Sequence, residues 1–359
     1  MAPQVFNFTN LKKIATLMRD HRPAQILNTL HFASHALRGF PMMRLPYEPL
    51  HLVLFVTARC NLHCIHCLRR NPASPRQPQR FHDMTLEFFR QILDRFPRAI
   101  AITVTGGEPL AHPQLFTMIH QAHEQRLKVR LFTNGTMVAG KVEALLKAPV
   151  EFLNVSLYGT DRENFMKVTG ADGLIFDATL EGVAELARRR HSSGYPRILQ
   201  TSFILTKDNL HQAIDFIRLS EKIGVDQVKL NSMRVHGILG FAESKGLGAE
   251  DQEVQDLFAD LRQQHLQIPV FLPRLYRHGD NRQCTMPFRL LPIDGDGFIG
   301  PCCVEGTARG FDNFFKEPDL WNGPTMISAR RALMELACQL PPICRDCEEM
   351  IPERPSLGC

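Results

Sequence analysis

Residues 52–67 read LVLFVTARCNLHCIHC, an apolar run that is followed directly by cysteines. The β-branched run at 52–57 predicts a buried β-strand. Three cysteines and two histidines follow within eight residues: Cys60, His63, Cys64, His66 and Cys67. Zinc sites, disulfides, redox pairs and iron–sulfur clusters all use such side chains. The surrounding sequence is needed to choose among these four kinds of site.

Strand-like runs alternate with helical segments over residues 52–231. The expected strands are 52–57, 101–105, 128–133, 151–157, 197–205 and 226–231. Helices are expected between them, at about 85–96, 112–125, 138–147, 174–190 and 209–223. This alternation predicts an α/β fold with a parallel sheet and right-handed crossovers, a partial (β/α)6 TIM-like barrel. Because chemistry sits at the C-terminal ends of the strands in such barrels, the cysteines are placed on the functional edge.

Segments of different composition flank the barrel. We assign 1–47 to a short helical N-terminal prefix, 48–240 to the barrel, 241–283 to a linking helical segment and 284–359 to a small Cys-rich α+β domain. The prefix carries apolar residues at helical spacing and several basic residues against a single acid, Asp20. Such a helix can lie on anionic lipid, but packing of the prefix on the barrel is the favoured interpretation.

Composition indicates a globular protein, since 44% of the 359 residues are hydrophobic and 22% are charged. The net charge of +5 is mild and is explained by solubility. No nucleic-acid partner is expected. The expected oligomeric state is a monomer. No apolar run is long enough to predict a transmembrane helix, and the N-terminus lacks the layout of a secretory signal. A cytoplasmic location is therefore expected, where ten cysteines favour metal or cluster ligation over disulfides.

The spacing of the first three cysteines favours a cluster over zinc. Three thiolates suffice for three irons of a 4Fe–4S cube and leave the fourth iron open to another ligand. A structural zinc prefers four closed ligands. Neither His63 nor His66 lies at a spacing that completes a comfortable tetrahedron with all three thiols.

Directly after the first strand, CNLHCIHC resembles the CxxxCxΦC motif of the radical SAM superfamily, with His66 at the aromatic-type position Φ. The resemblance implies that Cys60, Cys64 and Cys67 ligate a 4Fe–4S cluster and that S-adenosylmethionine (SAM) chelates the open iron. It also implies a reductant such as flavodoxin or ferredoxin, and cleavage of SAM to a 5′-deoxyadenosyl radical that abstracts a substrate hydrogen. His66 is then a packing neighbour of the bound nucleoside, and His63 a loop residue.

Three further motifs follow the next strands: TGGEP at 105–109, TNG at 133–135 and VSLYGT at 155–160. The first matches the family's GGEP motif. There, Gly106 and Gly107 would let the backbone approach a ligand closely, and Glu108 would accept hydrogen bonds from the ligand ammonium. By the same resemblance, Asn134 and Ser156 are candidates for contacts with the ribose and carboxylate of SAM.

The tail holds seven of the ten cysteines: Cys284, Cys302, Cys303, Cys338, Cys344, Cys347 and Cys359. A β-hairpin is expected around the turn sequence DGDG at 294–297, and it would bring its flanking cysteines together. CRDC at 344–347 supplies two more thiols. Four thiolates make a closed site, which suits zinc and iron–sulfur clusters equally.

The tail pattern C…DGxxxPC…CxxC resembles the SPASM and Twitch extensions of radical SAM enzymes, and the shorter Twitch form with one auxiliary 4Fe–4S cluster fits better. The resemblance implies four ligands: Cys284, Cys302, Cys344 and Cys347. Cys303 is the alternative to Cys302. Cys338 is expected in the core, and Cys359 is not expected to be a ligand.

A cluster with four protein ligands has no open iron for substrate, so electron transfer is its expected use. This predicts a two-electron oxidation, as in the Twitch alcohol dehydrogenase of aminocyclitol antibiotic biosynthesis. The expected function is a radical SAM oxidoreductase acting on a small molecule or natural-product precursor. The alternatives are radical modification of a peptide or protein side chain (maturation, cross-linking or epimerisation) and a non-catalytic zinc- or cluster-binding protein. Lys207, Arg234 and His236 are candidates for the base that takes the hydroxyl proton.

Overall fold

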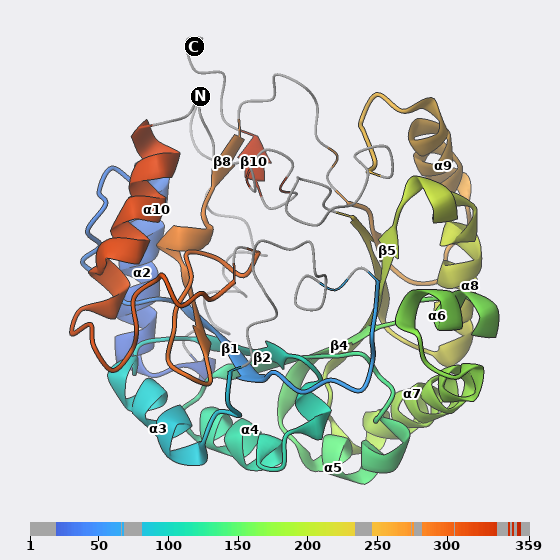
Figure 1. Ribbon diagram of the computed structural model, residues 1–359, viewed down its shortest axis with the longest axis horizontal. Coiled ribbons are helices and arrows are strands. Elements are labelled where there is room, and N and C mark those ends of the chain that lie inside the picture. The colour runs from blue at the N-terminus through green and yellow to red at the C-terminus, as the bar shows by residue number, and fades with distance from the viewer. Residues whose placement is uncertain are drawn as a thin grey trace.

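The computed structural model contains one open sheet of eight parallel strands, with helices around its outer face (Figure 1). The structure describes residues 19–65, 67, 81–233, 246–273, 275, 282–304, 306–335, 344, 347 and 350–352. Five residues singled out in the sequence lie outside these ranges: His66, Arg234, His236, Cys338 and Cys359.

The strands of the sheet run in the spatial order β7-β6-β5-β4-β3-β2-β1-β9, and every neighbouring pair is parallel. Their bounds are β1 (His51–Thr57), β2 (Ala101–Gly106), β3 (Lys128–Thr133), β4 (Val150–Ser156), β5 (Ile198–Leu205), β6 (Gln227–Ser232), β7 (Val270–Phe271) and β9 (Leu290–Asp294). The first six match the predicted βα units. The sheet stays open, so the predicted partial barrel is confirmed.

The helices of the described residues are α2 (Pro23–Leu37), α3 (Leu86–Arg95), α4 (Leu115–Glu124), α5 (Val142–Lys147), α6 (Arg162–Thr169), α7 (Gly173–Ser193), α8 (Ala213–Ile223), α9 (Gln252–Gln263) and α10 (Pro324–Glu335). Figure 1 shows α3, α4, α5, α7 and α8 around the outside of the strands. Within the described ranges, no helix combines the length and the apolar character that crossing a bilayer requires.

The two faces of the sheet differ in polarity because successive side chains of a strand point to opposite faces. Leu52, Leu54 and Val56 of β1 are fully buried in the core that the helices cover. The alternate positions form the opposite face, which we call the concave face. Its members include Val53, Phe55, Thr103, Arg130, Asn154, Gln200, Ser202, Gln227 and Lys229.

Two strands belong to the eight-stranded sheet without having been predicted as part of it. The linking segment supplies β7, and the Cys-rich tail supplies β9, which pairs in parallel with β1. The predicted turn after β9 is present, with a single antiparallel bridge between Ile293 and Ile299 in place of a full hairpin. The tail also forms a small antiparallel pair of β8 (Arg282–Cys284) with β10 (Met350–Pro352). The sheet therefore includes a strand from the tail, so its edge does not coincide with the expected boundary between the barrel and the tail.

Candidate functional site

The loop that carries Cys60 is clamped onto the end of β2. The backbone N–H groups of Gly107 and Glu108 donate to the carbonyl oxygens of Thr57 and Arg59, each over 2.7 Å. A Cβ at Gly107 would overlap the Arg59 carbonyl oxygen. Gly106 has a φ of +139°, and a Cβ there would overlap the carbonyl oxygen of Thr57. The two glycines are therefore required for the close contact between the end of β2 and the cysteine loop. The predicted close approach of their backbone to a ligand stays a prediction.

Glu108 joins the ends of two strands. Its side chain has no exposed surface, and its carboxylate accepts hydrogen bonds from the N–H of Leu110 (2.9 Å), the hydroxyl of Thr133 (2.7 Å) and the N–H of Asn134 (2.7 Å). Burial raises the pKa of this carboxyl, and the three hydrogen bonds oppose the rise. The sequence did not anticipate these bonds, which tie β2 to β3. A contact of Glu108 with a ligand ammonium stays a prediction.

Asn134 lies directly against the first cysteine. Its side-chain amide donates to Cys60 Sγ over 3.7 Å and to Asn61 Oδ1 over 3.0 Å. Its Oδ1 accepts from the hydroxyl of Thr136 over 2.7 Å, and this hydroxyl in turn accepts from Asn61 Nδ2 over 2.8 Å. The TNG turn and the cysteine loop therefore hold each other in place, as their predicted positions on one edge require.

Helix α6 supports the middle of the cysteine loop. The N–H of His63 donates to the carbonyl oxygen of Thr169, and the N–H of Ile65 donates to that of Val168, both over 2.9 Å. Leu62 is 2% exposed and packs in a small apolar cluster with Phe165. The loop is thus bound from three sides: by the turns after β2 and β3 and by the end of α6.

Tyr158, which the sequence did not single out, lies near the three cysteines. Burial raises the pKa of its hydroxyl, and the nearby thiols of Cys64, Cys67 and Cys60 raise it further. Ser156 hydrogen-bonds to this hydroxyl and also accepts from Asn154 Nδ2 over 3.2 Å. The signal was present in VSLYGT, where a tyrosine follows the predicted serine by two residues and shares its face of the chain.

The cysteines of the tail gather on the concave face of β1. Cys284 and Cys347 are each 6% exposed and cluster with Val53, and Cys302 and Phe55 pack against the same cluster. The N–H of Cys347 donates to the carbonyl oxygen of Cys344 over 3.3 Å. Four predicted ligands are therefore brought to one region.

The two adjacent cysteines of the tail differ in burial. Cys302 packs in the apolar cluster, whereas Cys303 is exposed. Burial raises the pKa of Cys284 to about 12, and the thiols of Cys347 and Cys303 add to the rise, so Cys303 also lies near this cysteine.

Both groups of thiols fit iron–sulfur clusters in their chemistry. The eight described cysteines are not joined in disulfides, and the first three are partly buried beside an amide donor. Soft sulfur ligands in a partly apolar setting are what such clusters use. Among the described residues, no three His, Cys, Asp or Glu side chains converge as the ligands of one metal ion would. The tail cysteines are grouped by their packing with Val53, and Cys60 is placed by its contact with Asn134.

Polar side chains of the concave face form a chain of hydrogen bonds across β6, β5 and β4. Gln227 Nε2 donates to Gln200 Oε1 and Gln200 Nε2 donates to Asn154 Oδ1, both over 2.7 Å. Asn154 Nδ2 donates to Ser202 Oγ over 3.0 Å. Lys229 lies beside Ser202 in register and has no hydrogen bond or ion pair among the described residues. In the sequence, this surface is indicated by polar residues at every second position of the fifth and sixth strands.

Lys207, one of the three candidate bases, is paired with a carboxylate. Its Nζ lies 3.0 Å from Asp251 Oδ2, which precedes α9. A role for Lys207 as the base stays a prediction without support from this contact.

Comparisons with known proteins agree with the two groups of cysteines. The model of the Radical SAM superfamily matches residues 54–220, and that of the SPASM iron–sulfur cluster-binding domain matches residues 284–348. A probable GTP 3′,8-cyclase of Metallosphaera sedula is 27% identical over 240 residues, which cover 64% of this chain and 70% of that protein. An AdoMet-dependent heme synthase of Methanosarcina barkeri is 30% identical over 170 residues, 47% of this chain and 46% of that protein.

Solved structures share the fold at low identity. SuiB of Streptococcus suis bound to S-adenosylmethionine aligns with a TM-score of 0.64 at 16% identity, over 98% of this chain and 83% of that one. The structure of anSMEcpe with bound AdoMet aligns with a TM-score of 0.61 at 16% identity, over 81% and 85%. The two family models give the cofactors as SAM, a 4Fe–4S cluster and an auxiliary iron–sulfur cluster. The chain belongs to the radical SAM superfamily and carries a C-terminal SPASM-type domain.

Proposed function

We propose that this chain is an oxidoreductase of the dehydrogenase type that acts on a small polar molecule or natural-product precursor. When bound, SAM and its cluster supply the 5′-deoxyadenosyl radical that abstracts a substrate hydrogen, and the auxiliary cluster takes up an electron from the substrate. The first cluster would be held by Cys60, Cys64 and Cys67. The second would be held by four cysteines of the tail: Cys284, Cys302, Cys344 and Cys347.

The observation that carries the proposal is the placement of both groups of cysteines on β1. Cys284, Cys302 and Cys347 cluster with Val53 and Phe55 of this strand. The first ligand of the other group follows Phe55 by only five residues, which span at most about 18 Å when fully extended. A substrate on the concave face would therefore lie near both groups, as removal of a hydrogen and then an electron requires.

The concave face supports a small polar substrate. Its amide and hydroxyl groups offer directional hydrogen bonds, and Lys229 offers a positive charge. Two relatives bear names that specify small molecules, GTP and heme. The contacts of Asn134 and Ser156 with SAM, the reductant (flavodoxin or ferredoxin), the cytoplasmic location and the monomeric state are part of this proposal.

Anaerobic reconstitution tests the two sites separately. The wild-type chain should hold about eight irons and cleave SAM when reduced with dithionite. Cys64→Ala should lose this cleavage. Cys344→Ala should keep the cleavage but fail to form oxidised product, because the auxiliary cluster is lost. An oxidised product from the Cys344→Ala variant would refute the electron-accepting role.

Deuterium transfer identifies the class of substrate. A deuterated small molecule should pass its label to 5′-deoxyadenosine in the wild-type chain. Transfer from peptides, and from no small molecule in the same panel, would replace this proposal by modification of a peptide or protein side chain.

A further inference from the structure

Helix α2 turns polar side chains toward the protein and leucines toward solvent. Gln25 and Asn28 are 1% and 2% exposed, whereas Leu27, Leu30 and Leu37 are 55%, 56% and 89% exposed. A surface helix of a globular protein normally buries its apolar side. The predicted packing of the prefix on the barrel is present, and the two buried polar side chains contribute to it beside the apolar Phe32.

The three leucines form one stripe along the helix. At about 100° per residue, Leu27, Leu30 and Leu37 fall within an arc of about 80°, and Gln25 and Asn28 point to the other side. Met42, 46% exposed, follows shortly after the helix ends. We call Leu27, Leu30 and Leu37 the leucine stripe.

Hydrogen bonds fix the orientation of α2. Gln25 Nε2 donates to the carbonyl oxygens of Ala99 (2.7 Å) and Gln125 (3.1 Å). The side chain of Asn28 donates to the carbonyl oxygen of Glu48 (3.1 Å) and accepts from its N–H (2.9 Å). Rotating the helix to bury the leucines would break the hydrogen bonds of Gln25 and Asn28. Each buried polar group left without a partner would lower the free energy of unfolding. The leucine stripe is therefore held outward.

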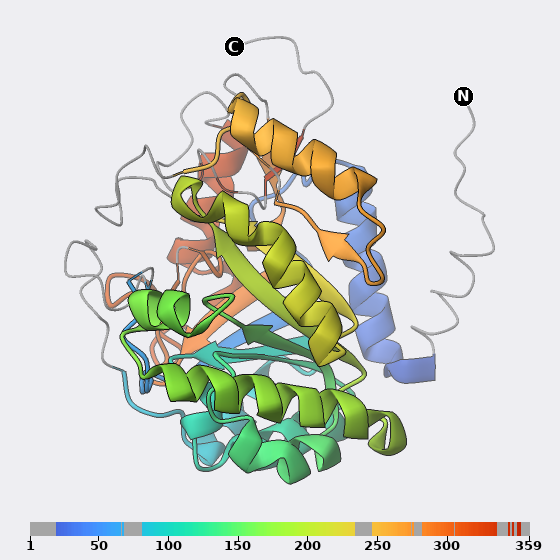
Figure 2. The same ribbon diagram turned by 90° about the vertical axis from the view of Figure 1, so that its right-hand side faces the viewer.

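These contacts also place α2 at the end of the barrel away from the cysteines. Residues 99 and 125 precede β2 and β3, so α2 covers the N-terminal ends of the strands. Figure 2 shows α2, in blue, on the opposite side of the molecule from α6, in bright green, which supports the cysteine loop. A surface bound to α2 would leave the C-terminal edge of the sheet open to substrate.

The net charge of the protein resides in the prefix. Of the 42 Lys and Arg and 37 Asp and Glu in the chain, residues 1–47 hold six and one. The prefix therefore carries +5, and the rest of the chain balances with 36 of each sign. Helix α2 itself contains no acidic residue, and the guanidinium of Arg38, at its C-terminal end, bonds to Ser34 and to no carboxylate among the described residues.

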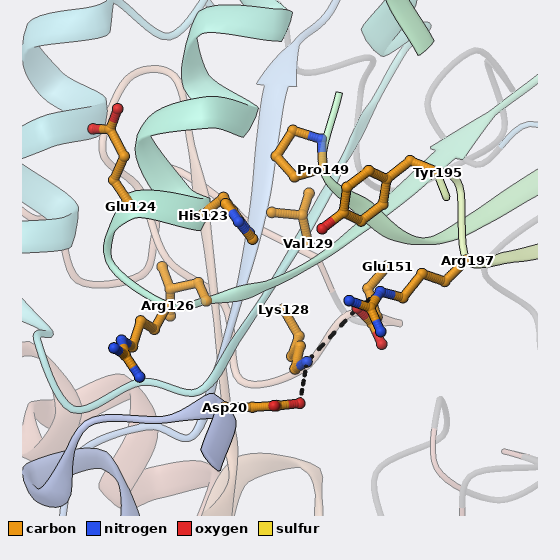
Figure 3. Close-up of a pocket in the computed structure, with 11 residues that line it drawn as sticks. Asp20, His123, Glu124, Arg126, Lys128, Val129, Pro149, Glu151, Tyr195 and Arg197 are labelled. Carbon is orange, nitrogen blue, oxygen red and sulfur yellow. Dashed lines mark hydrogen bonds and ion pairs between the residues drawn. The ribbon is translucent and has the colours of Figure 1, made fainter. Parts of the chain in front are cut away.

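Asp20, the one acid of the prefix, is neutralised by the barrel. Lys128 Nζ lies 2.6 Å from Asp20 Oδ2 and 3.7 Å from Glu151 Oε2, and Arg19 Nε lies 2.9 Å from Asp20 Oδ1. Figure 3 shows Lys128 between the two carboxylates, beside a cavity of about 400 Å³. No unpaired acid of the prefix is thus left to repel an anionic surface.

We propose that α2 docks this enzyme on an anionic lipid surface, with the leucine stripe inserted at the level of the headgroups and the guanidinium of Arg38 facing the phosphates. Apolar side chains that are fixed outward, next to a concentrated positive charge, are the combination by which interfacial helices bind anionic bilayers. The proposal is independent of the reaction proposed above.

Co-sedimentation of the full chain with lipid vesicles tests the proposal. We expect binding to vesicles of phosphatidylcholine and phosphatidylglycerol (3:1), little binding to phosphatidylcholine alone, and release in 0.5 M NaCl, which screens the charges. The double variant Leu27→Ser/Leu30→Ser should bind at least about tenfold more weakly, because each lost leucine removes apolar area from the contact. Leu174→Ser, at a leucine that is 65% exposed on α7, should bind like the wild type.

Three outcomes of these binding measurements would overturn the proposal: wild-type chain that stays in solution at low salt, equal binding by the double variant, or a dimer in sedimentation velocity that the double variant dissociates without loss of vesicle binding.

Hydroxyl-radical footprinting adds a direct readout at Leu37. Strong labelling without lipid and protection by anionic vesicles are expected. Weak labelling without lipid would mean that another segment of the chain already covers the leucine stripe, which also overturns the proposal.

Discussion

Gly107 has no room for a side chain, since an added Cβ would overlap the carbonyl oxygen of Arg59 in the cysteine loop. We expect Gly107→Ala to displace this loop, to lower the iron content of the reconstituted protein by about half, and to abolish SAM cleavage. Gly140→Ala is the matched control, because nothing lies within 4 Å of its added Cβ. Full iron content in Gly107→Ala would show that the clamp between the two loops is dispensable.

The two adjacent cysteines of the tail can be told apart by single substitutions. Cys302 packs with the buried Cys284 and Cys347, and Cys303 is exposed. We therefore expect Cys302→Ala to lose about four irons and Cys303→Ala to keep them. Iron analysis and low-temperature EPR of the reduced proteins measure this directly. The reverse result would make Cys303 the ligand.

The segment before α2 is tied to β3 by the pair of Asp20 with Lys128. Hydrogen bonds from Lys128 and Arg19 lower the pKa of Asp20 from 3.8 to about 2. Since the folded-state pKa lies below the unfolded value, the stabilisation is complete well above pH 4 and is lost as the pH falls through 2. We expect Asp20→Asn to lower the free energy of unfolding by on the order of 1 kcal/mol at pH 7, since the pair is partly exposed.

Urea denaturation of the wild type and Asp20→Asn at two pH values measures this pair. The difference between the two proteins should fall at pH 3 to about half of its value at pH 7, because Asp20 is then largely protonated in the unfolded chain. A difference that is unchanged at pH 3 would assign the stabilisation to uncharged contacts of this side chain.

The orientation of α2 illustrates what a local pattern can and cannot predict. Apolar residues at helical spacing predict that the prefix packs on the barrel, and surface helices normally bury their apolar side. In α2 the polar side faces the barrel instead, because the carbonyl oxygens of Ala99 and Gln125 accept hydrogen bonds from Gln25. These carbonyls come from distant parts of the chain, so no local window of sequence contains the information.

For the whole molecule, the sequence predicts the parts of the fold that repeat and the parts of the site that follow strand ends. The six βα units and the first three cysteines were found because periodicity and motif spacing are local. The hairpin expected at 294–297 implies a strand at β9, but its parallel pairing with β1 was not predicted, because LLPID is buried along its whole length and shows no alternation. Tyr158 and Lys229 were missed because their roles depend on which strands lie side by side.

The pairing of β9 with β1 makes the tail and the barrel one folding unit. Leu291 and Ile293 of β9 have no exposed surface and belong to the same core as β1. We expect Leu291→Ala to cost about 2–5 kcal/mol and to shift a single unfolding transition that circular dichroism and release of iron from both clusters report together. Leu174→Ala, at an exposed leucine, should leave that transition within about 0.5 kcal/mol of the wild type. If the tail were an independent domain, Leu291→Ala would instead separate an early loss of auxiliary iron from a later unfolding of the barrel, and SAM cleavage would survive the first step.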